Sequence, residues 1–539
     1  MTPENTLSIY GSHDAGAVYI DSNGNIKVLE YERFVKKRYA MFSSDQDHRE
    51  GLGSNDQERR DFLIYIINDT RDRLLEHVVY NELGEKDKEL ISEYFPGCEF
   101  HKKEHHESHA ASGFFTSNFK KSLILSIDGG GVDNGDVGYT RSYIGEGNTV
   151  SLLENLPIDF GGAYGQIGCP ISEINPGPDS NQISLSYAGK VMGICAYGKS
   201  RSDWVYPMIR YYTWAYQNLE ATDEATVLKV LGNDISLDLS FNTLSGQNSY
   251  DLAATSQECF EAGMFTIVKK YLNIENIDSI ILVGGCALNV LFNQKLYEWL
   301  KINKPGIELY VPATPSDCGL ALGQFLHQFP SVAKGKSLTY NGFEVLDGAC
   351  WDQMVDTYKA TKTSVSEIVD LLKQGKIIGL MEGQSEVGPR ALGNRSIICD
   401  PSFPDMKDIL NSKVKFREWF RPFAPVCRLE DKDIYFENAC ESEFMSYAPK
   451  VKAEFREKLK SVTHADNTSR LQTVTRAQHE RFYNILEELS SRGEVPVILN
   501  TSFNIKGKPI LTTIEDALHV LDNTKLDYVV IQGYIFKKI

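Results

Sequence analysis

Short apolar segments alternate with amphipathic ones along most of the 539 residues, and this alternation restricts the fold more than any other feature. Leu123–Ile127, Ile280–Val283 and Ile307–Val311 are short and apolar, which is typical of buried strands. A helical segment follows the last of them from about Gly319. Strands that alternate with helices predict an α/β fold, in which ligands bind at the carboxyl ends of strands.

The N-terminal segment predicts a β-hairpin and a third strand. Leu7–Tyr10 and Ala17–Ile20 are apolar and flank the turn Gly11–Asp14, and a second tight turn leads into Ile26–Glu30. Apolar residues at helical spacing then predict one helix over about Asp56–Asn81.

The chain is too long for one ordinary hydrophobic core, so more than one domain is expected. The alternation loosens around residues 336–364, which predicts an N-terminal domain over 1–350 and a C-terminal domain over 351–539. The second domain has its own alternation of helix, strand, helix and strand, at Val365–Gln374, Ile377–Met381, Gln478–Ser491 and Val495–Leu499.

Composition predicts a globular protein of the cytoplasm with no membrane association. Hydrophobic residues make up 42% of the chain, no run approaches 18 apolar residues, and the first residues do not resemble a signal peptide. Ten cysteines are scattered without a Cys-x-x-Cys pair, which favours buried thiols over a zinc cage or disulfides. The net charge of −17 argues against a broad basic face for nucleic acid but leaves a local basic groove open.

The segment Gly388–Ser396 is the strongest functional signal. It carries Arg390 and Arg395 in a turn rich in Gly, Pro, Asn and Ser, and such a turn presents backbone N–H groups and guanidinium forks to a phosphate or carboxylate. A surface salt bridge is the alternative for two arginines alone. Three more cations follow, interleaved with aromatic residues and prolines, namely Lys415, Arg417 and Arg421. Together with Arg390 and Arg395 they predict an anion pocket.

His105 and His109 are the second signal. On a helix these two residues share one face and can chelate a metal ion, although a solvated helix face is the alternative for a histidine pair. Asp128 ends an apolar strand and Asp317 follows another. Two histidines and two aspartates suit iron(II), manganese or zinc, and the sequence does not choose among them.

Glycines and small polar residues mark two further candidate sites. Gly284 and Gly285 join a strand to a helix, where the backbone can approach a nucleotide, although tight packing is the alternative. In the C-terminal part, Ser502 and Asn504 can complement phosphate oxygens, and turn formation or helix capping is the alternative.

These segments together resemble the NodU/CmcH family of O-carbamoyltransferases, in the order that family has. The resemblance spans essentially the whole chain. It rests on Ser12–Ala15, Glu32–Phe34, His105–Ser112, Asp128-Gly129, Lys190–Gly193, Gly284–Asn289, Asp317, Gly388–Ser396, Lys415–Pro425 and Asn500–Gly507.

The resemblance implies an actin/Hsp70-like N-terminal domain, similar to the TsaD protein that modifies tRNA, and a YrdC-like α/β C-terminal domain. In that family the YrdC-like domain makes carbamoyl-adenylate from carbamoyl phosphate and ATP, the latter with Mg²⁺. The first domain then passes the carbamoyl group to an acceptor hydroxyl. Internal transfer would protect a fragile mixed anhydride from water.

The resemblance also implies roles for individual residues. The carbamoyl phosphate and ATP pocket would comprise Arg390, Arg395, Lys415, Arg417, Arg421, His464, Ser502 and Asn504. Iron(II) would be held by His105, His109, Asp128 and Asp317. Adenosine would be lined by Gly129, Gly130, Gly284, Gly285 and Asn289. His13 and Asp14 would act as general base or position the acceptor alcohol.

One departure from the family pattern bears on the acceptor. Antibiotic-modifying members carry Gly-Arg-Met-Glu before the Gly-Pro-Arg turn, whereas this chain has Gly383-Gln384-Ser385-Glu386. The variant is closer to viral and marine members, some of which are thought to carbamoylate hydroxymethylated pyrimidines. A small-molecule alcohol and 5-hydroxymethylcytosine, as nucleotide or in DNA, therefore both stay open as acceptors. A homodimer is compatible with this interpretation.

Two other classes of function compete with a carbamoyltransferase. An ATP-gated Hsp70-like binding protein would need apolar walls in its client groove, and the arginine and lysine clusters argue against these. An actin-like sugar kinase would leave the histidine pair and the second domain unexplained.

Overall fold

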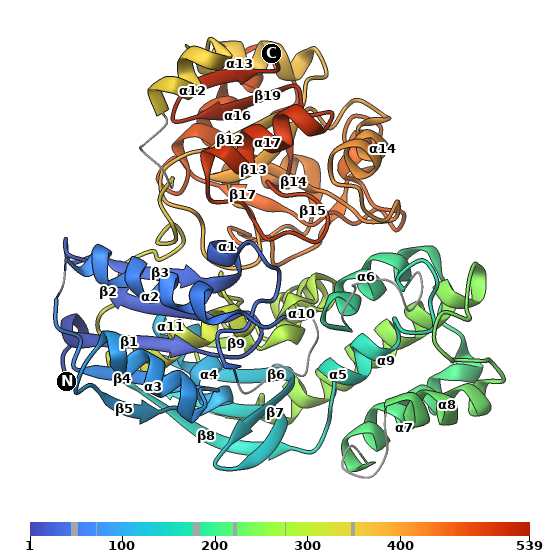
Figure 1. The fold of residues 1–539 in the computed structure, drawn as a ribbon. Coiled ribbons are helices and arrows are strands. Elements are labelled where there is room, and N and C mark those ends of the chain that lie inside the picture. Colours follow the sequence, from blue (N-terminus) through green and yellow to red (C-terminus); the bar gives the residue numbers. More distant parts are fainter. Residues whose placement is uncertain (45–51, 72, 176–183, 219–223, 275, 346–350) are drawn as a thin grey trace. The chain divides into compact units, whose positions relative to one another are not determined.

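The computed structural model describes residues 1–44, 52–71, 73–175, 184–218, 224–274, 276–345 and 351–539. The chain divides into two compact units: unit 1 comprises Met1–Lys103, Asp317–Thr463 and Asn467–Ile539, and unit 2 comprises Glu104–Ser316 and His464–Asp466. Both units contain helices and strands, so the predicted α/β class is confirmed (Figure 1). The predicted domains 1–350 and 351–539 have other bounds than these units and stay a prediction.

The N-terminal sheet of unit 1 confirms the predicted hairpin and third strand. Its strands, in spatial order, are β3 (Ile26–Glu30), β2 (Gly16–Ile20), β1 (Thr6–Tyr10), β4 (His77–Asn81) and β5 (Glu99–Lys102). The first three run antiparallel to one another, and β1, β4 and β5 run parallel. Leu7 and Ile9 face a core with α2 (Asp56–Thr70) and α3 (Glu85–Tyr94). On the opposite face, the Ser8 hydroxyl donates to the Ala321 carbonyl of α11 (Leu320–Gln328) at 2.7 Å.

The predicted helix over Asp56–Asn81 is wrong in its second half. Helix α2 spans Asp56–Thr70 and ends at Arg71, whose φ of 51° is left-handed. The residues from His77 form β4 instead, because Val78 and Val79 are fully buried in a strand that pairs with β1. Tertiary pairing here outweighs a helical spacing of apolar residues.

Unit 2 repeats the topology of the first sheet. Its strands, in spatial order, are β8 (Thr149–Leu156), β7 (Asp136–Glu146), β6 (Lys121–Asp133), β9 (Ser279–Val283) and β10 (Glu308–Tyr310). The directions are also the same, with antiparallel pairing among the first three strands and parallel pairing among the last three. The two sheets therefore share one strand order and one pattern of strand directions.

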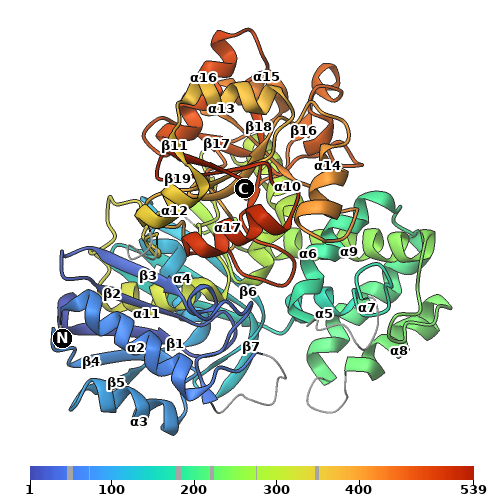
Figure 2. The same cartoon turned by 45° about the horizontal axis from the view of Figure 1, so that its top comes forward.

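The third large sheet, in unit 1, has eight strands: β11 (Thr361–Lys362), β20 (Tyr534–Lys537), β19 (Tyr528–Ile531), β12 (Ile378–Met381), β13 (Arg395–Cys399), β18 (Val497–Ser502), β14 (Ala424–Arg428) and β17 (Gln472–Val474). One face packs on α13 (Val365–Lys373) and α16 (Glu480–Ser491). The other packs on α17 (Ile514–Asn523), as Figure 2 shows. The helices and strands predicted for this region are confirmed. Within the described part of the chain, no helix combines the length and apolar character needed to cross a bilayer.

Candidate functional site

The two histidines of the predicted metal site lie one turn apart on α4 (His105–Phe115) in unit 2. Both side chains point at one carboxylate: Nε2 of His105 and of His109 lie 3.3 and 2.9 Å from Oδ2 of Asp128. Both histidines are almost completely buried, so the alternative of a solvated helix face is excluded. Gly113 lets α4 approach β9, because a Cβ there would lie 2.7 Å from Val283 Cγ1.

The two oxygens of Asp128 have separate partners. Oδ1 accepts hydrogen bonds from the backbone N–H groups of Gly129 at 2.8 Å and Gly285 at 3.1 Å, and this fixes the carboxylate with Oδ2 toward the histidines. Burial alone would raise the pKa of Asp128, but the hydrogen bonds and charges of His105 and His109 outweigh it and hold the pKa well below its usual value. Asp128 is therefore an ionised ligand candidate.

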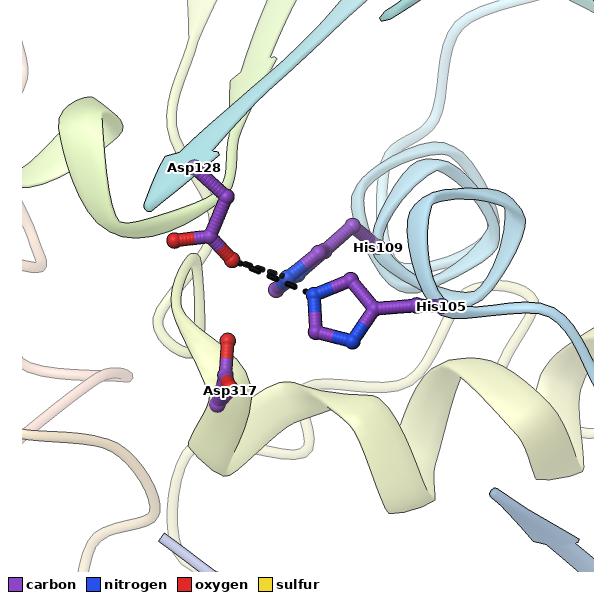
Figure 3. A group of neighbouring side chains, drawn as sticks. All are labelled: His105, His109, Asp128 and Asp317. Carbon is purple, nitrogen blue, oxygen red and sulfur yellow. Dashed lines mark hydrogen bonds and ion pairs between the residues drawn. The ribbon is translucent and has the colours of Figure 1, made fainter. Parts of the chain in front are cut away.

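Figure 3 shows these three side chains with Asp317. Asp317 follows Ser316, the residue at which a segment of unit 2 ends. Just before it, the Pro315 carbonyl accepts a hydrogen bond of 2.6 Å from the Gly284 N–H of unit 2. The four ligand atoms lie within 4.8 Å of one another. Two imidazole nitrogens and two carboxylate oxygens fit a divalent transition metal.

Gly131 provides the space for the His105 ring. A Cβ at this position would lie 2.2 Å from Cδ2 of the buried His105 ring, so the ring would have to move. We expect Gly131→Ala to turn the ring away from Asp128 and to weaken metal binding by about 10–100-fold, as is typical when support for a metal ligand is lost. Metal content after dialysis at a fixed free metal concentration measures this.

Gly189→Ala is the matched control, because a Cβ at Gly189 meets nothing within 4 Å. Unchanged metal binding in Gly131→Ala would contradict the assignment of His105 as a ligand.

His106, between the two candidate ligands, has a structural role. Its ring lies 2.8 Å from the Ser126 hydroxyl through Nδ1 and 2.8 Å from the Gly138 carbonyl through Nε2. Burial and the neighbouring His105 lower the pKa of His106 to about 3. The ring is therefore neutral, accepting from Ser126 and donating to the carbonyl.

His13 and Asp14 lie in the turn between β1 and β2 of unit 1. The His13 ring is placed between two carboxylates, with Nδ1 at 3.0 Å from Asp14 Oδ2 and Nε2 at 3.4 Å from Asp317 Oδ2. The Tyr10 hydroxyl donates to the same Asp317 oxygen at 2.8 Å. The imidazole is about one-fifth exposed, so a substrate hydroxyl can reach it.

The glycines predicted to line adenosine surround Asp128. Gly284 follows β9 and has a φ of 85°, and a Cβ there would lie 2.2 Å from the carbonyl oxygen of Ile127 in β6. Only glycine therefore fits where β9 ends beside β6. The side chain of Asn289 is already paired: it caps α10 (Val290–Asn303) through Phe292 N–H and exchanges two hydrogen bonds of 3.0 Å with Gln257. Its predicted contact with adenosine stays a prediction.

In unit 1 the structure brings Lys415, Ser502 and Asn504 together. The Lys415 ammonium donates to the Ser502 carbonyl at 2.7 Å, to its hydroxyl at 3.2 Å and to the carbonyl and side-chain oxygens of Asn504. All of these acceptors are neutral. Burial, followed by repulsion from Arg417 and Arg421, lowers the pKa of Lys415 well below its usual value.

The arginines around Lys415 repel one another. Arg417 stacks over Phe423 at 4.4 Å and donates to the Asn411 side chain at 2.8 Å, and Arg421 lies 3.5 Å from Glu418. Arg390 makes no hydrogen bond or ion pair with any residue that the structure describes. Burial, then Arg421 and Arg38, lowers the pKa of Arg390 to about 10. Such a cluster is suited to a ligand with several negative charges.

Sequence reasoning missed two members of this cationic cluster, which we define as Arg38, Arg390, Lys415, Arg417, Arg421 and Arg470. Burial lowers the pKa of Arg470 well below its usual value, with further lowering by Arg390, Arg417 and Arg421. Arg38 contributes to the lowering at Lys415 and Arg390. Neither residue lies in a glycine-rich turn, and only the tertiary structure brings them to the others.

Two of the predicted phosphate ligands have other partners. Arg395 is fully buried and donates to four backbone carbonyls, those of Glu382, Asn394, Phe343 and Gly383, at 2.6–3.2 Å. His464 belongs to unit 2 by its contacts, with its ring nitrogen 2.8 Å from the Gly193 carbonyl. The contacts of Arg395 are those of a residue that holds a loop together. Phosphate binding by either side chain stays a prediction.

Two family models match this chain. The model described as Carbamoyltransferase N-terminus matches residues 6–326, and the one described as Carbamoyltransferase C-terminus matches residues 369–538.

Relatives are found along the whole length. Nodulation protein NolNO of Sinorhizobium fredii is 31% identical over 461 residues, which cover 80% of this chain and 63% of that protein, so the chain spans less than two thirds of it. Uncharacterized protein MJ1051 of Methanocaldococcus jannaschii is 28% identical, with 99% of both chains covered. The chain also has a distant likeness to a crystal structure of full-length HypF, with 10% sequence identity and a TM-score of 0.36. The match covers 62% of this chain and 57% of HypF.

Proposed function

Because this chain belongs to the carbamoyltransferase family, we propose that it is an ATP-dependent O-carbamoyltransferase. In the proposed reaction, water first hydrolyses carbamoyl phosphate to carbamate and phosphate, and carbamate then attacks ATP to give carbamoyl-adenylate and pyrophosphate. An acceptor hydroxyl takes the carbamoyl group and releases AMP. The observation that carries the proposal is the cationic cluster, in which burial and mutual repulsion lower the pKa of Arg390, Lys415 and Arg470. Phosphates of two substrates would supply the missing negative charge.

Unit 1 would carry the first half-reaction. Arg390 and Arg421 would grip phosphate oxygens, and Lys415, held by Ser502 and Asn504, would present its ammonium to the same anions. ATP would enter with Mg²⁺, as the resemblance implies. Fixed cations in a buried site stabilise charge as it moves to the leaving pyrophosphate.

A divalent metal, for which we propose iron(II), would be held by His105, His109, Asp128 and Asp317. Bound there, it would supply Lewis-acid stabilisation of the adenylate phosphate. His13 would take the proton of the acceptor alcohol on Nε2, with Asp317 bound to the metal and Asp14 on Nδ1 holding the ring and stabilising the charge that develops on it. An alcohol is a poor nucleophile without such a base.

Two classes of acceptor are proposed: a small-molecule alcohol, and 5-hydroxymethylcytosine as nucleotide or in DNA. We expect the chain, incubated with ATP, carbamoyl phosphate and a panel of both classes, to yield a product heavier by one carbamoyl group in mass spectrometry. Asp14→Asn should still release pyrophosphate but should lose about 10²-fold or more in product formation, as expected for a group that supports the general base.

Asp352→Asn, an exposed carboxylate on α12 (Trp351–Tyr358), is the control and should behave as the wild type. Release of ADP would instead indicate a sugar kinase. ATP turnover that ignores carbamoyl phosphate would indicate an Hsp70-like binding protein. The expected cytoplasmic location and homodimer stay predictions.

A further inference from the structure

Three potential metal ligands lie on the N-terminal sheet of unit 1, outside the proposed reaction. His77 begins β4, and Glu99 and His101 belong to the edge strand β5. We propose that these three residues form a second divalent-metal site, with Zn²⁺ as its preferred ion. This proposal is independent of the carbamoyl-transfer function.

The distances among the three ligand atoms suit one small ion. Nδ1 of His77 lies 3.2 Å from Nε2 of His101, and these nitrogens lie 3.6 and 3.8 Å from Oε2 of Glu99. Tetrahedral zinc with bonds of 2.0–2.1 Å requires ligand atoms about 3.3 Å apart. The nitrogen pair is therefore already at the required separation, and a rotation of the exposed Glu99 side chain closes the remaining gap.

The sheet itself sets this geometry. Glu99 and His101 are two residues apart in β5, so their side chains leave the same face, whereas Phe100 between them packs toward the hydrophobic core. His77 is the direct partner of Glu99 in the parallel register of β4 and β5. Three ligands on paired strands are held with little conformational freedom, which favours a defined site.

The three side chains also leave room for an ion. His77 is 16% and Glu99 70% exposed, so an ion and a water ligand have access. Two histidines and one carboxylate with an open fourth position form a set that zinc adopts in proteins. Bound zinc would tie the edge strand β5 to β4.

Zinc stoichiometry tests the proposal in the full chain. We expect metal-free protein, dialysed against a fixed free concentration of Zn²⁺, to bind one more equivalent per chain than His101→Gln does. His519→Gln is the matched control, because His519 lies on α17 and bonds only to Asn523 of its own helix among the described residues. It should retain the wild-type stoichiometry.

Two further variants make the result decisive. His109→Ala removes a ligand of the other candidate site, so the deficit of His101→Gln should persist in that background whether or not the other site binds zinc. Glu99→Gln keeps both rings and should weaken zinc binding about tenfold, even if His101→Gln folds poorly. Equal stoichiometry in the wild type and His101→Gln, or unchanged zinc affinity in Glu99→Gln, overturns the proposal.

Discussion

Arg390→Ala is expected to reduce pyrophosphate release from ATP and carbamoyl phosphate by about 10²–10³-fold, the usual loss when a charge-stabilising group is removed from a buried site. Arg390 bonds to no other described residue, so its removal leaves no structural acceptor unpaired. The loss should therefore appear in catalysis and not in folding. A radiometric or coupled pyrophosphate assay measures it.

The free energy of unfolding of Arg390→Ala is a second test. Arg421 and Arg38 repel Arg390, so the free energy of unfolding without ligands should not fall in Arg390→Ala. Arg476→Ala is the matched control, since Arg476 pairs with Glu487 at an exposed position and should leave pyrophosphate release unchanged. A normal rate of pyrophosphate release in Arg390→Ala would refute the assigned pocket.

His109→Ala should separate the two half-reactions. Loss of one imidazole from the metal group should lower metal content and reduce carbamoyl transfer by about 10²-fold or more, in line with the effect of weakening a metal site. Pyrophosphate release should stay within about twofold of the wild type, because the cationic cluster does not include this residue. Parallel assays of pyrophosphate and carbamoylated product test the separation.

A matched histidine variant controls for general damage. His519→Ala on α17 should retain both half-reactions and the metal content of the wild type. Equal loss of adenylate formation and transfer in His109→Ala would contradict the assignment of the two steps to different residues.

The sequence predicted best where the signal is local. His105 and His109 share a face because i and i+4 always do so on a helix, and Asp128 was identified as the polar end of an apolar run. The strands of the first hairpin were equally clear. Each of these predictions needs only neighbours along the chain.

The misses have one physical cause, namely that they depend on partners distant in the sequence. Helix α2 was extended through β4 because only the pairing with β1 reveals the strand. Arg38 and Arg470 join the cationic cluster from separate segments. The four backbone carbonyls to which the Arg395 guanidinium donates are likewise seen only in the folded chain, and the predicted phosphate contact of Arg395 stays a prediction.

The two sheets of equal strand order place polar residues differently along their first strands. In one sheet His13 and Asp14 lie in the turn that connects β1 to β2, and in the other Asp128 lies at a bulge inside β6. Under the proposed function, a single sheet design would serve proton transfer in one place and ion binding in the other.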